Sequence, residues 1–135
     1  MRAKQETNIR TRQIKFGSTV SETFTLNTGL SNELLQAALD FWSKKGLIIK
    51  EVTKPDAFSV SEDPLDVGFV CEGGTIWTTE FENYKKAVTV SMTGGLKQTQ
   101  VFVNMVLPGG FMSAQDRKRA AQMLWEFNEN LTVVS

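Results

Sequence analysis

Hydrophobic and polar residues alternate along several short segments of the chain, as they do in strands with one buried face. The first clear segment is Glu22–Asn27, in which Phe24 and Leu26 alternate with threonines. An earlier segment, Arg12–Phe16, is a second candidate, which the turn Gly17-Ser18 would connect to the first. We therefore expect the chain to enter its fold through one or two strands.

The pattern then changes to the spacing of an amphipathic helix. This helix is expected to begin after Ser31, whose hydroxyl would cap the first turn, with Leu30 and Leu35 placed as a hydrophobic staple. It is expected to end before Gly46, because glycine readily takes the left-handed conformation that follows many helices. Its apolar residues form one stripe: Leu34, Leu35, Ala38, Leu39 and Trp42.

The middle of the chain returns to strand patterns, punctuated by two pairs of glycines. Adjacent glycines supply the positive φ angles of a tight hairpin turn without steric cost. Gly73-Gly74 is therefore expected to join two strands directly, and Thr93-Gly94-Gly95 is expected to do the same further on. The expected strands are Leu47–Thr53, Ala57–Val60, Val67–Glu72, Thr75–Phe81, Ala87–Met92 and Gln98–Leu107.

A second amphipathic helix is expected near the C-terminus. Ser113 is placed to cap it, and Asp116, three residues on, gives a near relative of the capping box. The helix is expected to span about 17 residues with a regular apolar stripe. That stripe consists of Ala120, Leu124, Phe127 and Leu131, flanked by Ala121, Met123 and Trp125.

These elements predict one α+β domain over residues 1–135, with residues 1–11 as a flexible basic arm. Consecutive hairpins form an antiparallel meander, here a curved sheet with one face covered by an N-terminal and a C-terminal helix in two layers. Without the short segment Ala57–Val60, the order is β-α-β-β-β-β-β-α. That order resembles the helix-grip fold of START and Bet v 1 proteins, which implies a sheet wrapped around a long last helix. A TATA-binding-protein-like or cystatin-like sandwich is the alternative.

Composition narrows the chemistry. Hydrophobic residues make up 41% of the chain and charged residues 22%, which is typical of a globular protein. No apolar run approaches the roughly 20 residues of a membrane helix, and Met1–Lys15 is polar, so a cytoplasmic location is expected. The chain has no histidine, which excludes Ser-His-Asp machinery and most zinc sites. No catalytic residue, metal site or cofactor is predicted, and the lone Cys71 is expected to be a buried hydrophobe.

The net charge is zero, but it is unevenly distributed. Residues 1–50 carry eight basic and four acidic groups, whereas residues 51–82 carry one basic and eight acidic groups. The acidic residues Glu62, Asp63 and Asp66 lack the spacing of a calcium loop, so a solvated loop is expected. Without a broad basic face or a recognised motif, no nucleic-acid partner is expected.

The candidate site is a mostly apolar interior with a few hydroxyl groups, which is typical of a small-molecule pocket. We predict a non-enzymatic module that binds an apolar or amphipathic small molecule between the sheet and the C-terminal helix. One alternative is a homo-oligomerising or partner-binding domain, because Gln98–Leu107 is apolar on both faces. A second is a carboxylate enzyme that uses Glu80, Glu82 or Tyr84. The predicted lining residues are Trp77, Thr79, Phe81, Phe102, Met105, Leu124 and Phe127.

Overall fold

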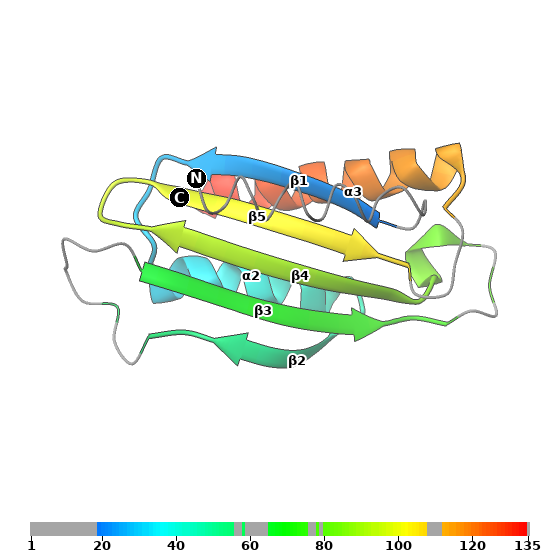
Figure 1. Ribbon diagram of the computed structural model, residues 1–135, viewed down its shortest axis with the longest axis horizontal. Coiled ribbons are helices and arrows are strands. Elements are labelled where there is room, and N and C mark those ends of the chain that lie inside the picture. The colour runs from blue at the N-terminus through cyan, green and yellow to red at the C-terminus, as the bar shows by residue number, and fades with distance from the viewer. Residues whose placement is uncertain are drawn as a thin grey trace.

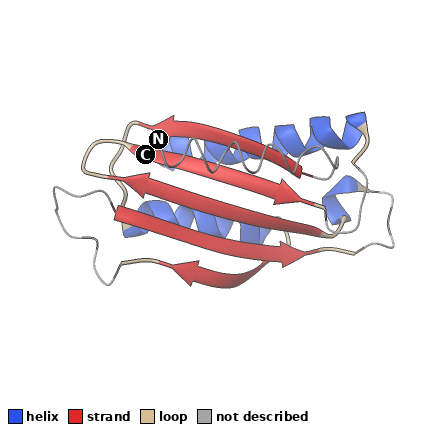
Figure 2. Ribbon diagram, viewed as in Figure 1, coloured by secondary structure: helices blue, strands red, loops and turns tan. Residues whose placement is uncertain are grey.

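The computed structural model describes residues 19–55, 58, 65–75, 78, 80–107 and 112–134. Within them, five strands form one antiparallel sheet and two helices cover the same face of it, as Figure 1 and Figure 2 show. The predicted arm 1–11 and the strand candidate Arg12–Phe16 lie outside the described residues. Phe58, the only described residue of the segment Ala57–Val60, is not in a strand.

The sheet has the order β1-β5-β4-β3-β2. Strands β2 to β5 follow one another as a meander. The first strand of the chain, β1, lies at one edge of the sheet and pairs with the last strand, β5. This arrangement confirms the predicted α+β, two-layer, helix-grip-like fold, although four described strands, rather than five, lie between the helices. The strands are β1 (Thr19–Leu26), β2 (Ile48–Thr53), β3 (Leu65–Gly73), β4 (Lys86–Gly94) and β5 (Thr99–Val106).

Helix α2 (Asn32–Lys44) begins and ends where its sequence signals predict. The backbone N–H of Leu34 donates to the hydroxyl of Ser31 at 3.2 Å, which satisfies one of the unpaired donors of the first turn. Gly46 has a φ of 88°, and the N–H of Leu47 donates back to the carbonyl of Trp42 at 3.2 Å. These bonds confirm both helix ends.

Helix α3 (Ala114–Val134) is held at its start by a reciprocal capping box. The N–H of Asp116 donates to the Ser113 hydroxyl at 3.1 Å, and the N–H of Ser113 donates to the Asp116 carboxylate at 3.3 Å. The helix has 21 described residues and is therefore longer than the 17 or so predicted. Its last turns are retained because Leu131 is fully buried.

The predicted hairpin at Gly73-Gly74 is wrong. Strand β3 pairs with β2 along one edge and with β4 along the other, and Gly73 lies opposite Lys86. Both edges of β3 are therefore occupied, and no position remains for a strand at Thr75–Phe81. Among its described residues, Thr75 makes only an isolated bridge to Tyr84, and Phe81 opens the 3₁₀ helix η2 (Phe81–Asn83).

The second glycine pair does lie in the predicted hairpin, in which residues 95–98 connect the paired strands. The last paired residues of β4 and β5 are Gly94 and Thr99, and the N–H of Gly95 donates to the carbonyl of Gln98 at 3.1 Å. Neither Gly94 nor Gly95 has a positive φ. Gly94 is instead required by space, since a Cβ there would lie 2.6 Å from the Thr99 hydroxyl.

Candidate functional site

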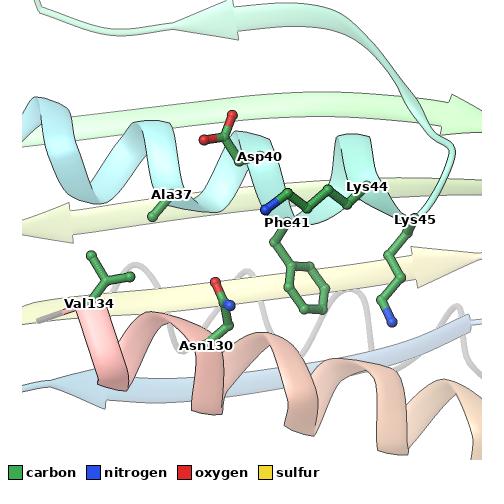
Figure 3. Close-up of a pocket in the computed structure, with 7 residues that line it drawn as sticks. All are labelled: Ala37, Asp40, Phe41, Lys44, Lys45, Asn130 and Val134. Atoms are coloured by element: carbon green, nitrogen blue, oxygen red, sulfur yellow. The ribbon is translucent and has the colours of Figure 1, made fainter.

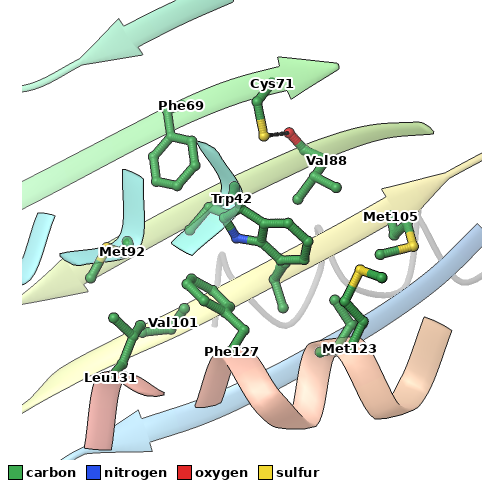
Figure 4. Packing of buried hydrophobic residues seen from close by; sticks show 14 of the residues in the cluster. Trp42, Phe69, Cys71, Val88, Met92, Val101, Met105, Met123, Phe127 and Leu131 are labelled. Carbon is green, nitrogen blue, oxygen red and sulfur yellow. Dashed lines mark hydrogen bonds between the residues drawn. The ribbon is translucent and has the colours of Figure 1, made fainter. Parts of the chain in front are cut away.

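Three of the predicted lining residues lie together in the layer between the sheet and the helices. Met105 is on the covered face of β5, whereas Leu124 and Phe127 are on the side of α3 that faces the sheet. All three side chains have no solvent exposure. Figure 4 shows Met105 and Phe127 in this layer, together with residues of α2 and the central strands.

The other predicted lining residues lie elsewhere. Phe102 alternates with Val101 and Val103, which are buried under the helices, so it lies on the opposite face of the sheet and does not line this layer. Phe81 is buried at the end of the sheet, in η2, and not on a strand. Trp77 and Thr79 lie outside the described residues.

The centre of the layer is an aromatic cluster formed by Phe24, Phe41, Trp42 and Phe127. The ring of Phe127 lies 5.2 Å from both Trp42 and Phe41, and 5.9 Å from Phe24, measured between centroids. Phe41 also packs edge-on against Trp42 at 4.9 Å. These separations are those of favourable aromatic pairs, so residues of β1, α2 and α3 are held against one another here.

Among the described residues, Trp42 contains the one buried side-chain polar atom that has no hydrogen-bond partner. Its side chain has no solvent exposure, yet its indole Nε1 has no hydrogen-bond partner among the described residues. A buried donor without an acceptor costs about 1–3 kcal/mol relative to a satisfied one. Figure 4 shows the indole lying among Phe69, Met92, Val101 and Phe127, which offer no conventional acceptor. The Trp42 N–H is therefore a polar group in an otherwise apolar layer.

Methionine supplies much of the wall around this cluster. Met92 and Met105 are fully buried, and Met112 and Met123 are only 2% and 7% exposed. Methionine is unbranched and polarisable, so it fills irregular spaces and tolerates changes of shape nearby. A layer walled by four such side chains can adapt to an added molecule more readily than one built from β-branched residues.

A groove opens directly above the aromatic cluster, between α2 and α3, with a volume of about 410 Å³. Phe41 lines this groove and also packs on Trp42 and Phe127, as Figure 3 and the ring distances show together. Phe41 is therefore in contact both with the groove and with the ring of Trp42. The groove is lined by Ala37, Asp40, Phe41, Lys44, Lys45, Asn130 and Val134.

The rim of the groove carries both charges. Lys45 pairs with Glu126 of α3 at 3.2 Å, and its ammonium lies 5.3 Å above the ring of Phe41. Asp40 accepts a hydrogen bond from Gln36 at 2.9 Å. Lysine stems and the Phe41 ring give the groove an apolar floor with a polar edge, which suits an amphipathic molecule.

A second hollow, of about 340 Å³, lies where the turn after α2 meets η2. As in the first groove, its walls are polar and apolar in similar measure. They comprise Lys45, Gly46, Leu47, Gly74, Thr75, Thr78, Glu82, Asn83 and Tyr84.

Lys86 anchors η2 to the end of β4. Its side chain is only 2% exposed, and its ammonium donates to the carbonyls of Phe81, Glu82 and Tyr84 at 2.6, 3.0 and 3.1 Å. Burial lowers the pKa of Lys86 to about 8, with Glu82 opposing the shift. All three N–H donors of the ammonium are used by these carbonyls, so the lysine serves to hold the turn.

The candidate carboxylate enzyme finds little support in this geometry. Glu82 pairs with Arg119 of α3 at 2.8 Å, and Glu80 accepts a hydrogen bond from Asn83 at 3.0 Å. A hydrogen bond from its own backbone N–H, and then Arg119, hold the pKa of Glu82 below its usual value. A general acid near neutral pH needs a raised pKa, so Glu82 is unsuited to that role.

Cys71 is a poor candidate for a reactive residue. Cys71 is fully buried and its thiol donates weakly to the carbonyl of Val88 at 3.7 Å, and burial raises its pKa to about 12. A thiol with that pKa is a poor nucleophile. Over the described part of the chain, no group of three acidic or sulfur ligands is placed to hold a metal ion. None of the described helices is both long enough and apolar enough to cross a bilayer.

Comparison with known proteins gives structural similarity only. No protein-family model matches the sequence, and no curated protein does. The crystal structure of Ara h 8.0201 is 14% identical with a TM-score of 0.44, covering 86% of this chain and 95% of that one. A START superfamily protein from Mycobacterium smegmatis is 15% identical with a TM-score of 0.43 and the same two coverages. At these values neither similarity bears on function.

Proposed function

We propose that this chain is a non-enzymatic module that binds an apolar or amphipathic small molecule between the sheet and α3. The observation that carries the proposal is the buried indole N–H of Trp42, which has no hydrogen-bond partner in the described part of the chain. Small-molecule sites are mostly apolar and contain a few polar groups that fix the orientation of the ligand. The layer around Trp42 has that composition, because its side chains are apolar and the indole N–H of Trp42 can donate a hydrogen bond to a ligand.

The chemistry of the layer defines the ligand. An apolar body would contact Met105, Leu124 and Phe127, which are fully buried and offer no polar group of their own. One acceptor, such as a carbonyl oxygen, would accept the hydrogen bond from Trp42 Nε1. Pairing that donor recovers about 1–3 kcal/mol that an apolar ligand of equal size leaves unrecovered.

The groove between α2 and α3 offers the way in. Its volume of about 410 Å³ lies within the range of small-molecule sites, and Phe41, which lines it, packs against the Trp42 ring. Rotation of Phe41 would open the groove toward the Trp42 ring. The adaptable side chains of Met92 and Met105 would take up the remaining change of shape.

A matched pair of probes tests the proposal. 2-Decanone and decane have similar apolar bodies, but only the ketone carries an acceptor. Native mass spectrometry and titration followed by the indole ¹⁵N–¹H NMR signals should find 2-decanone bound about tenfold more tightly, with the Trp42 signal moved downfield. Trp42→Phe assigns that signal and should remove the preference for the ketone.

The control is Trp125→Phe, which changes a tryptophan that is 59% exposed on the other side of α3. This variant should retain the tenfold preference. Failure of both probes to bind would contradict the proposed function. A Trp42 signal that shows a nuclear Overhauser contact with trapped water and ignores 2-decanone would likewise refute it, because the donor would already be satisfied.

A further inference from the structure

The side of α3 that faces away from the sheet is unusual for a solvent-exposed helix. Trp125 is 59% exposed and Val133 is 86% exposed, and both fall on the face opposite the buried stripe. Lys118, Gln122 and Glu129 share this outer face at helical spacing. Tryptophan is enriched at the centres of protein interfaces, where its apolar body is covered.

Beyond Asp116 in its first turn, the charges of α3 are segregated by sign along the helix. Its first half contains Arg117, Lys118 and Arg119, and its second half contains Glu126 and Glu129. Cations favour a helix C-terminus and anions favour an N-terminus, so this order does not stabilise an isolated helix. It is, however, complementary to a second copy of itself laid antiparallel.

Contacts within the chain account for three of these five charges. Arg117 donates to the carbonyl of Thr19 at 3.4 Å, Arg119 pairs with Glu82, and Glu126 pairs with Lys45. Lys118 and Glu129 have no ion-pair partner in the described ranges. Both are exposed on the outer face with Trp125. The charges without a partner are therefore one of each sign, on the same face as the exposed tryptophan.

We propose that the outer face of α3 is a homodimerisation surface, on which a second copy of this chain packs its own α3 antiparallel. Lys118 and Glu129 are eleven residues apart, about 16 Å along the axis. A two-fold axis halfway between them brings each Lys118 beside Glu129 of the second copy. Both ion pairs form together because the interface is isologous.

The same two-fold axis brings the exposed apolar residues of the two helices into the interface. Trp125 lies within about 2 Å of the axis along the helix, so the two indoles cover each other at the centre of the contact. Val133 is level with Ala114 of the second copy along the axis, and Ala121, also on this side, is small enough to allow close approach. A single helix face buries little area, so the dimer is a weak one.

Charge reversal tests the pairing directly by sedimentation equilibrium. Lys118→Glu and Glu129→Lys each place like charges opposite each other and should weaken dimerisation by about tenfold. The double variant restores opposite charges and should return within about threefold of the native affinity. Lys97→Glu, in the exposed turn between β4 and β5, makes the same charge change away from α3 and should have no effect.

The apolar centre is tested separately. Trp125→Ala should weaken the dimer by about tenfold or more, whereas Leu96→Ala, which removes a 63% exposed leucine from the turn after β4, should not. A native chain that stays monomeric at millimolar concentration would overturn the proposal. A double charge variant as weak as the single variants would also overturn it. Neither result affects the ligand proposal, which concerns the opposite side of α3.

Discussion

The two sides of α3 have opposite relations to water. On the side that faces the sheet, Ala120, Leu124, Phe127 and Leu131 have no exposure at all. On the outer side, Trp125 keeps 59% of its surface in solvent although it is among the largest apolar residues of the helix. The first side is fixed by packing within the chain, whereas the second is largely exposed to solvent.

Two tryptophans express this difference most sharply. Trp42, on α2 against the inner side of α3, has a buried ring, and its N–H has no hydrogen-bond partner among the residues that the structure describes. The side chain of Trp125 is instead mostly exposed, so its apolar ring is in contact with solvent. Sites where a sequence departs from full satisfaction are where function is expected. A ligand with an acceptor would complete the inner site, and a second helix would complete the outer one.

Removing the inner contact should have the largest effect on stability. Phe127→Ala deletes a fully buried ring that contacts Trp42, Phe41 and Phe24, so we expect the free energy of unfolding to fall by about 3–5 kcal/mol. Phe127→Leu keeps most of the volume and should lose distinctly less. Urea unfolding followed by far-ultraviolet circular dichroism measures both, and a loss below about 1 kcal/mol for the alanine variant would contradict the packing described.

Lys86 holds the turn that contains η2, and Glu82 in this turn pairs with Arg119 of α3. The contact between η2 and α3 therefore depends on Lys86. Lys86→Met leaves three carbonyls without their common donor, and we expect a loss of about 1–3 kcal/mol at pH 7. Thermal unfolding measures this loss. Lys85→Met, which changes the exposed neighbouring lysine, is the matched control and should shift stability by no more than about 0.5 kcal/mol.

Lys86 also predicts a pH dependence with a definite sign. Burial lowers its pKa from 10.5 to about 8 in the folded chain, so between pH 8 and 10.5 the unfolded chain holds the proton more tightly. Stability from this group therefore rises as pH increases through that window, and it is lost as pH falls through 8. The difference in unfolding free energy between the native chain and Lys86→Met should grow from pH 8 to 10. A flat difference would contradict the lowered pKa.

The start of α3 provides a smaller test of what orients its two sides. Ser113→Ala removes the hydroxyl that accepts from Asp116 N–H and should reduce stability by about 1 kcal/mol. Ser113→Gly should reduce it by only a few tenths, because glycine suits the N-cap conformation. Chemical unfolding of both variants checks the order, and equal losses would count against the capping box.

These helix caps were predictable because they depend on residues three or four apart. The reciprocal bonds of Ser113 and Asp116 need only local sequence, as do Ser31 and Gly46 in α2. The connection after β3 was not predictable in this way, since alternation at Thr75–Phe81 satisfies a strand pattern. What excludes a strand there is that β2 and β4 already occupy both edges of β3, which is a property of the whole sheet.

The candidate site divides in the same way. Strand alternation alone separates Phe102 from Met105, so the sequence already placed them on opposite faces. It also contained an overlooked signal for Lys86, which shares its register with the buried Val88 and Val90. The groove between α2 and α3 carried no such signal, because Phe41 and Asn130 meet only when two distant helices pack together.

The smallest expected effect on the stability of the monomer belongs to Trp125. Its replacement by alanine removes a mostly exposed ring and substitutes a better helix former, and these two changes nearly cancel. At micromolar concentration, where a weak dimer dissociates, the free energy of unfolding should therefore change by no more than about 0.5 kcal/mol. A loss above about 2 kcal/mol would show that Trp125 is packed within its own chain. The distinction between the two sides of α3, together with its free outer surface, would then be wrong.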